Sequence, residues 1–173
     1  MSEMIRINGF IHSSVIDGVG NRLVYLVQGC SKKCLGCFNQ ECLDFNQGHS
    51  RSIDEIFYLI NRQATQTWYS GFTLSGGEPF CQPLECAILA EEAHNCGWDV
   101  WTYSGYTYEE LIELAETDEN VDRLLKATDV LVDGPFIEEL KDDNLKYRGS
   151  SNERIIALEN GRWKELLNYD EEV

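Results

Sequence analysis

The sequence predicts an α/β protein in which helices pack on the outside of a mostly parallel sheet. Segments with the two-residue periodicity of strands alternate along the chain with segments that have the 3.6-residue periodicity of helices. Every unusual motif also follows a predicted strand, as expected where parallel strands present their carboxyl ends to a ligand. With 173 residues, 43% hydrophobic and 25% charged, the chain suits one domain with a sizeable core.

The expected elements, in chain order, are strands over residues 5–12 and 22–29, a helix over 52–66, a strand over 71–79, a helix over 83–97, a strand over 98–104, helices over 107–116 and 120–128, and a strand over 129–134. The turn DGVGN joins the first two strands. Ser52 followed by Glu55 is a helix-capping pattern, and Pro83 and Gly97 mark the two ends of the next helix.

The last stretch of the chain, residues 152–173, is expected to add a short strand and a weak helix. An acidic tail over about residues 168–173 follows, which we expect to be disordered rather than to dock on a partner.

Composition excludes several classes of function. Fourteen Lys and Arg against thirty Asp and Glu give a net charge of −16, which argues against binding a nucleic-acid backbone. A solubility surface or a basic partner explains the charge instead. No membrane span or secretory signal is recognisable, so a cytoplasmic location is expected. Seven cysteines in a reducing compartment indicate metal or redox chemistry before disulfides.

Three of those cysteines, Cys30, Cys34 and Cys37, lie within one short segment, GCSKKCLGCFNQ. A cubane iron–sulfur cluster has four irons, so a loop that supplies three thiolates leaves one iron open to a small molecule. A structural zinc site needs a fourth ligand, usually from a second cysteine pair or a histidine pair. Cys42 follows at a gap of four residues, and the other candidates are scattered: His12, His49 and His94. Iron–sulfur is the favoured prediction, and zinc stays an alternative.

The motif SGGEP ends the next predicted strand. Gly76 and Gly77 have no Cβ, so a ligand can approach the main chain closely there. Glu78 offers a carboxylate that can accept hydrogen bonds from an ammonium group. A tight strand-to-helix turn explains the same residues without a ligand.

The cysteine segment and SGGEP together resemble the radical S-adenosylmethionine superfamily. The resemblance implies a small partial (β/α) barrel holding a [4Fe-4S] cluster. In that superfamily S-adenosylmethionine chelates the open iron and is cleaved reductively to a 5′-deoxyadenosyl radical. A narrower resemblance is to the anaerobic ribonucleoside-triphosphate reductase activating proteins, and it rests on motifs in this order: DGVGNR, QGCSKKCLGCFN, SGGEP, WTYSGY, VLVDGPF and YRGSSNER.

That likeness covers about residues 5–156 and implies one radical S-adenosylmethionine domain over residues 1–173. Val19 stands where the family pattern has proline, which affects the rigidity of the turn. The implied catalytic cluster ligands are Cys30, Cys34 and Cys37. The implied S-adenosylmethionine contacts are Gly36, Cys37, Phe38, Gly76, Gly77, Glu78 and Asp133. Phe38 packs on adenine or is a core aromatic, and Asp133 contacts the ligand or forms a structural turn.

For several other residues, a structural role competes with a role at the cofactor. Arg148 reaches the cofactor or a partner, or forms a surface salt bridge, and the salt bridge is favoured. Lys32 and Lys33 offset the charge of the cluster or belong to a solvated turn. The remaining cysteines match no metal pattern and are expected to be small apolar residues or incidental thiols: Cys42, Cys81, Cys86 and Cys96.

The chain leaves no room for a substrate-recognition domain, and residues 37–76 contain no ferredoxin-like cysteine insertion. A large partner is therefore expected to cover the carboxyl edge of the sheet. The resemblance implies that the partner is the glycyl-radical subunit of anaerobic ribonucleoside-triphosphate reductase. It also implies an electron donor such as flavodoxin or ferredoxin. The alternatives are a radical enzyme acting on another protein or a small molecule, an iron–sulfur electron-transfer protein, and a zinc-stabilised interaction module.

Overall fold

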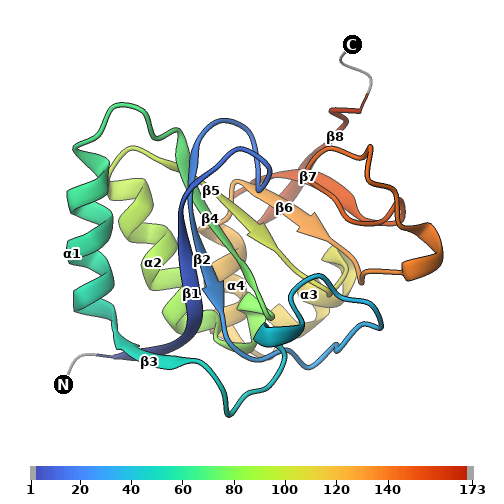
Figure 1. Ribbon diagram of the computed structural model, residues 1–173, viewed down its shortest axis with the longest axis horizontal. Helices are drawn as coiled ribbons and strands as arrows, with labels where there is room; N and C mark the ends of the chain where they lie inside the picture. The colour runs from blue at the N-terminus through green and yellow to red at the C-terminus, as the bar shows by residue number, and fades with distance from the viewer. Residues whose placement is uncertain (1–2, 171–173) are drawn as a thin grey trace.

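The computed structural model describes residues 3–170, and within them eight strands form one sheet in the order β3-β1-β2-β4-β5-β6-β7-β8 (Figure 1). The strands are β1 Met4–Ser14, β2 Arg22–Val27, β3 His49–Ser52, β4 Gly71–Gly76, β5 Asp99–Tyr103, β6 Val130–Asp133, β7 Arg154–Glu159 and β8 Arg162–Leu167. Neighbours among β2, β4, β5 and β6 are parallel, whereas the pairs at both edges are antiparallel. The predicted α/β class is confirmed, with a mixed sheet whose centre is parallel.

Four α-helices connect the central strands within the described residues: α1 Ile53–Ala64, α2 Pro83–Asn95, α3 Tyr108–Ala115 and α4 Glu119–Lys126. Ser52 caps α1 by accepting a hydrogen bond from the main-chain N–H of Asp54. Thr107 and Glu110 form a reciprocal capping box at the start of α3. Residues 3–170 also contain three short 3₁₀ helices, Gln40–Cys42, Pro79–Cys81 and Glu138–Leu140.

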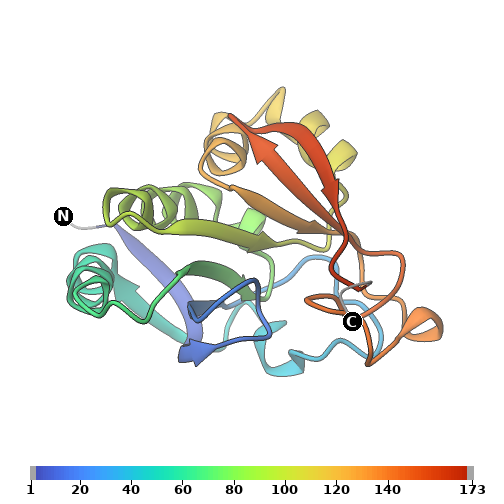
Figure 2. The ribbon, with the colours of Figure 1, turned by 90° about the horizontal axis from the view of Figure 1, so that it is seen from above.

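The helices cover one face of the sheet, here called the helix face (Figure 2). Side chains alternate between faces along a strand, and the buried set that packs with the helices includes Leu23, Tyr25, Phe72, Leu74, Val100 and Leu131. The alternate residues point to the opposite face, here called the open face. There Trp101, Val130, Val132 and Ile155 form a second, smaller cluster. The open face is the one that carries the site described below.

The carboxyl end of the chain differs from its prediction. The short strand is confirmed as β7, but the weak helix is wrong, because β8 pairs with β7 as an antiparallel hairpin. Asn160 and Gly161 join them, both with positive φ (49° and 77°), as a two-residue turn between right-twisted strands requires. The end of the acidic tail, residues 171–173, lies outside the described residues.

The polar strand β3 was not predicted, since HSRS has no apolar alternation. It forms because its main chain pairs with residues Met4–Ile7 of β1. Within residues 3–170, no helix has the length and apolar character needed to cross a membrane.

Candidate active site

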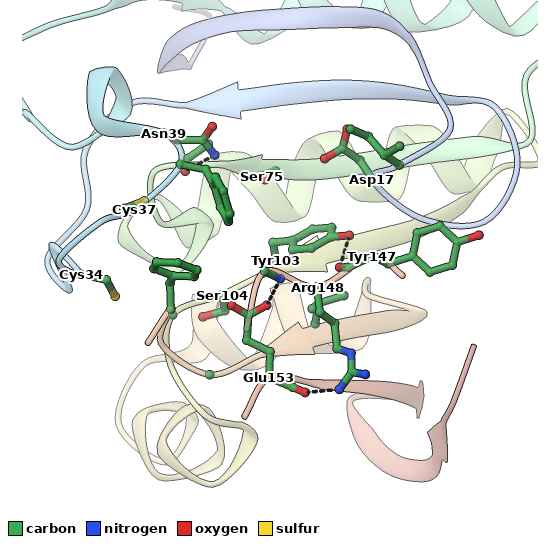
Figure 3. Close-up of a pocket in the computed structure, with 18 of the residues that line it drawn as sticks. Asp17, Cys34, Cys37, Asn39, Ser75, Tyr103, Ser104, Tyr147, Arg148 and Glu153 are labelled. Carbon is green, nitrogen blue, oxygen red and sulfur yellow. Dashed lines mark hydrogen bonds between the residues drawn. The ribbon is translucent and has the colours of Figure 1, made fainter. Parts of the chain in front are cut away.

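A cavity of about 850 Å³ lies on the open face at the carboxyl ends of the parallel strands. Figure 3 shows Cys34 and Cys37 at one end of it and Asp17 and Tyr147 towards the other. The four strand-end motifs all contribute to its wall through Cys30, Cys34, Cys37, Gly76, Gly77, Glu78, Ser104, Gly105, Gly134 and Phe136. Because β2 and β4 are in register from Arg22 with Gly71 to Val27 with Gly76, their motifs emerge level with each other.

The cysteine loop, residues 29–40, is anchored at its base and turns tightly in its middle. The N–H of Gly29 donates to the carbonyl of Cys42 at 2.7 Å, and that of Cys30 to Leu43 at 3.1 Å. The N–H of Cys37 donates to the carbonyl of Cys34 at 3.2 Å. Cys30 is buried, whereas Cys34 and Cys37 are half-buried. All three thiols line the cavity.

The arrangement of these thiols is compatible with a cubane cluster. Within the described residues, no three His, Cys, Asp or Glu side chains already converge as they would around one ion. A cubane cluster gives each thiolate its own iron, so its ligands line a space rather than meet at a point. Burial raises the pKa of Cys30 and of Cys37, and main-chain N–H groups donating to each sulfur act in the opposite direction. The donor set and the space fit the cluster.

The two glycines of SGGEP are required by their packing. A Cβ on Gly76, whose φ is +95°, would lie 2.6 Å from the nitrogen of Val27, and one on Gly77 would lie 2.3 Å from the carbonyl oxygen of Gly29. The N–H of Gly77 donates to Val27 at 2.9 Å, and that of Glu78 to Gly29 at 2.8 Å. The motif is therefore a tight turn against the base of the cysteine loop, and it leaves bare main chain at the cavity wall.

Glu78 is fully buried, and its carboxylate accepts three hydrogen bonds from the protein itself. The donors are the Ser104 hydroxyl at 2.9 Å and the N–H groups of Phe80 at 3.0 Å and Gly105 at 2.7 Å. Burial raises the pKa of Glu78 to about 7, against the opposing effect of these donors. The carboxylate thus links SGGEP to the turn after β5. Oε2 accepts only the Gly105 bond, so the carboxylate keeps acceptor capacity for a further donor.

Two predicted cofactor residues lie outside the cavity wall. Asp133 is buried and accepts from Arg154 Nε at 3.0 Å, from Arg154 Nη2 at 2.5 Å and from the N–H of Tyr108 at 2.6 Å. Of its two predicted roles, this geometry supports the structural turn. Gly36 has φ +76° and packs beside the Glu138 carboxylate.

Phe38 lies on the cavity wall with 58% of its surface exposed, so the core alternative is wrong. Its ring centroid is 5.0 Å from that of Phe136, which the motif DGPF supplies. The predicted stacking on adenine stays a prediction.

Several residues that line the cavity were quoted in motifs but given no role: Asp17, Tyr103, Ser104, Tyr147 and Glu153. The Tyr103 hydroxyl donates to the carbonyl of Tyr147 at 2.8 Å (Figure 3). Burial raises the pKa of Glu153. Their common signal was position at or after the end of a strand, or in the motif YRGSSNER.

Arg148 forms the favoured ion pair, with Asp170, and donates to the carbonyl of Glu153 at 2.9 Å. Its side chain is only 16% exposed and Arg148 also lines the cavity, so its predicted contact with the cofactor stays a prediction. Val19 is exposed, and its carbonyl accepts from Arg22 Nη1 at 2.9 Å. The other four cysteines do not line the cavity: Cys42 and Cys86 are buried, and Cys81 and Cys96 are half-buried. Burial raises the pKa of Cys42 to about 12, which suits an inert packing thiol.

Comparison with known families agrees with this geometry. Residues 16–156 match the family described as a 4Fe-4S single cluster domain. Together with the thiol-lined cavity, the match defines the chain as an α/β iron–sulfur protein.

The relatives narrow the class. Over 82% of its length the chain is 36% identical to the anaerobic ribonucleoside-triphosphate reductase-activating protein of Vibrio cholerae, of which it covers 90%. It is 35% identical to that of Haemophilus influenzae, with 83% and 92% of the two chains covered. It is 28% identical to that of bacteriophage T4, with 86% and 92% covered. The chain belongs to the family of anaerobic ribonucleoside-triphosphate reductase-activating proteins.

Among solved structures, QueE from Escherichia coli superimposes with a TM-score of 0.47 at 17% sequence identity, over 60% of this chain and 54% of that one.

Proposed function

We propose that the protein is a radical S-adenosylmethionine activase. It cleaves S-adenosylmethionine reductively at a [4Fe-4S] cluster held by Cys30, Cys34 and Cys37. The resulting 5′-deoxyadenosyl radical removes a hydrogen atom from a glycine of anaerobic ribonucleoside-triphosphate reductase. The observation that carries the proposal is the meeting of three thiols from one loop with the glycine motifs of two neighbouring strands in one cavity.

The chain supplies the positions on which this chemistry depends. The three thiols hold the cluster, which when bound supplies the electron for cleavage. Main chain at Gly76, Gly77 and Glu78 lies at the wall where the methionine end would bind. The exposed ring of Phe38, with Phe136 beside it, offers an apolar surface for adenine.

The partner is a macromolecule, because the mouth of the cavity is apolar and exposed. Val15 and Ile16 line the cavity with 67% and 75% of their surfaces exposed, and Leu35 is 80% exposed on the cysteine loop. Exposed apolar surface around a site is typical of a protein-binding face. We propose that the reductase covers this mouth and that flavodoxin or ferredoxin supplies the electron. We also propose that residues 1–173 form one domain whose curved sheet is a partial barrel.

The test is made without oxygen. The protein is reconstituted with iron and sulfide, reduced and mixed with S-adenosylmethionine, and 5′-deoxyadenosine is quantified by chromatography. Wild type and Cys81→Ala should form the product, while Cys34→Ala should not, because Cys34 lines the cavity and Cys81 does not. With purified reductase present, a glycyl radical should appear in the electron paramagnetic resonance spectrum.

Two outcomes contradict the proposal. If a fully loaded, reduced cluster yields no 5′-deoxyadenosine even with the reductase present, the chain is an electron carrier. If product forms but the reductase acquires no glycyl radical, the chemistry stands and the target is wrong.

A further inference from the structure

We propose that Lys32, Tyr106 and Glu110 are positioning residues that clamp the cysteine loop to the turn after β5 and so set the spacing between the thiols and SGGEP. The inference rests on the proposed function and concerns side chains outside the proposed set of cluster and S-adenosylmethionine contacts, of which Lys32 also lines the cavity. It follows from how three loops from neighbouring strands are fastened together.

The Lys32 side chain contacts two residues that follow β5, Glu110 and Tyr106. Its ammonium lies 3.2 Å from both carboxylate oxygens of Glu110, in the first turn of α3. The same ammonium lies 4.3 Å from the ring centroid of Tyr106. The Lys32 side chain is 25% exposed and that of Glu110 is 47% exposed, so Lys32 is partly shielded from water while solvent screens its partner.

A second contact fastens the adjacent residue. The Ser31 hydroxyl lies 2.9 Å from the Tyr106 hydroxyl, within hydrogen-bond distance. Consecutive residues of the cysteine loop therefore bind the same tyrosine, one at the hydroxyl and the other at the ring face. Lys32 also packs over Gly105, where a Cβ would lie 3.0 Å from the Lys32 Cγ.

The turn that receives these contacts is the one that Glu78 holds. Ser104 and Gly105 donate to the Glu78 carboxylate, and the next residue is Tyr106. Residues 104–106 are thus joined to SGGEP on one side and to the cysteine loop on the other. β4 and β5 pair only as far as Leu74 with Thr102, so beyond these strand ends the Glu78 carboxylate joins the two turns in place of hydrogen bonds between the strands.

The neighbouring Lys33 is the matched control. It is exposed, and within residues 3–170 its ammonium has no ion pair, hydrogen bond or ring contact. It has the same charge and lies in the same loop. A general effect of positive charge near the cluster would appear in both Lys32→Met and Lys33→Met, whereas a clamp affects only Lys32→Met.

The first readout needs no activity. Hydrogen–deuterium exchange over residues 29–38 of the cluster-free chain should rise in Lys32→Met and in Glu110→Gln by about three- to tenfold, as expected for losing one such contact. Lys33→Met should match wild type. Glu110→Gln retains the capping box, because glutamine at this position also accepts from the helix N-terminus.

A double-mutant cycle separates clamping from charge. If the residues act as a pair, the double variant Lys32→Met/Glu110→Gln should retain as much iron after desalting as Lys32→Met alone. Each single variant should also raise KM for S-adenosylmethionine more than it lowers kcat. If Lys32 acts through its own charge, the two single variants should move the cluster's reduction potential in opposite directions.

Opposite shifts in potential, or equal effects of Lys32→Met and Lys33→Met, would overturn the clamp. Failure of the proposed function is distinguishable from failure of the clamp. If the proposed function is wrong, no variant cleaves S-adenosylmethionine, while hydrogen–deuterium exchange in the cluster-free chain still reports whether the contacts of Lys32 hold the loop.

Discussion

The helix face and the open face are formed by alternate residues of the same strands, yet they differ in almost every property. On the helix face, Leu74, Val100 and Leu131 are fully buried against apolar side chains of the helices. On the open face, the neighbouring residues Ser75 and Tyr103 line a cavity. Because the side-chain period of a strand is two, one strand carries a stabilising surface and a functional surface at once.

The polar groups are distributed in the same way. Glu78 and Asp133 are buried at the carboxyl edge, and each is held by several protein donors. Such networks hold loops in place, whereas the helix face supplies most of the apolar burial. The two faces should therefore respond to substitution differently, with folding lost on one and the site lost on the other.

The largest effect is expected on the open face. Cys37→Ala removes a thiol that lines the cavity, so the cluster should be lost and product formation should fall to background. The free energy of unfolding of the cluster-free chain should change by less than about 1 kcal/mol, because Cys37 is only half-buried. Iron and sulfide content after reconstitution and urea denaturation are the two measurements.

Cys96→Ala is the matched control, since Cys96 is also half-buried but packs against the core of the helix face. It should keep its full iron content. A Cys37→Ala protein that still binds four irons per chain would show that this thiol is not a ligand.

The next largest effect is expected on the helix face, as a loss of unfolding free energy. Leu89 of α2 is fully buried in the main core, so Leu89→Ala should cost about 2–5 kcal/mol of unfolding free energy. Leu114→Ala is the control, because Leu114 is 38% exposed on α3 and should lose much less. Urea denaturation of the cluster-free chain measures both. Equal losses would mean that the helices do not form the stabilising layer.

Much of the division between the helix face and the open face was predictable from the sequence, for a physical reason. Strand and helix periodicity reports burial, so the parallel centre and the helices were predicted from it. Glycine and cysteine motifs after strands predicted where the cavity lies. The β7–β8 hairpin was missed because RWKELL has polar residues on an edge, although Asn160-Gly161 was a turn signal.

Roles of individual polar side chains were less predictable. Glu78 was expected to meet a ligand, and this stays a prediction; the three donors that it accepts from within its own fold were not predicted. Asp133 was placed at the correct edge, yet Arg154 binds its carboxylate from β7. Partners that lie far apart in sequence decide where a carboxylate points, and a single sequence does not record them.

A third prediction concerns how the buried carboxyl group of Glu78, at the carboxyl edge of the sheet, makes the unfolding free energy depend on pH. Burial raises the pKa of Glu78 from 4.5 to about 7, so the folded chain holds this proton more tightly than the unfolded chain. The stabilisation is present below pH 4.5 and is lost as pH rises through about 7, by on the order of 3 kcal/mol. In Glu78→Gln, the unfolding free energy should vary less between pH 5 and pH 8. An unchanged slope would mean that Glu78 is ionised throughout.

The smallest effect is expected at the opposite end of the strands, where His94 of α2 lies 2.7 Å from Asp129 at the start of β6. This hydrogen bond raises the pKa of His94 above 6.5, so the pair stabilises the fold below that pH and loses its contribution as pH rises. Both side chains are about one-third or more exposed, so solvent screening limits the contribution to below about 1 kcal/mol. His94→Gln should lower the unfolding free energy at pH 5.5 more than at pH 8.5.

His49→Gln is the control, because exposed His49 takes part in no ion pair within residues 3–170. Measured at the same two pH values, it is the reference for replacing a histidine by glutamine elsewhere in the chain. Cluster content should be normal in both variants, because neither histidine lines the cavity. If His94→Gln lost iron, the amino-terminal end of the sheet would be coupled to the cavity. Residues that stabilise the fold and residues that hold the cluster would then not form separate sets.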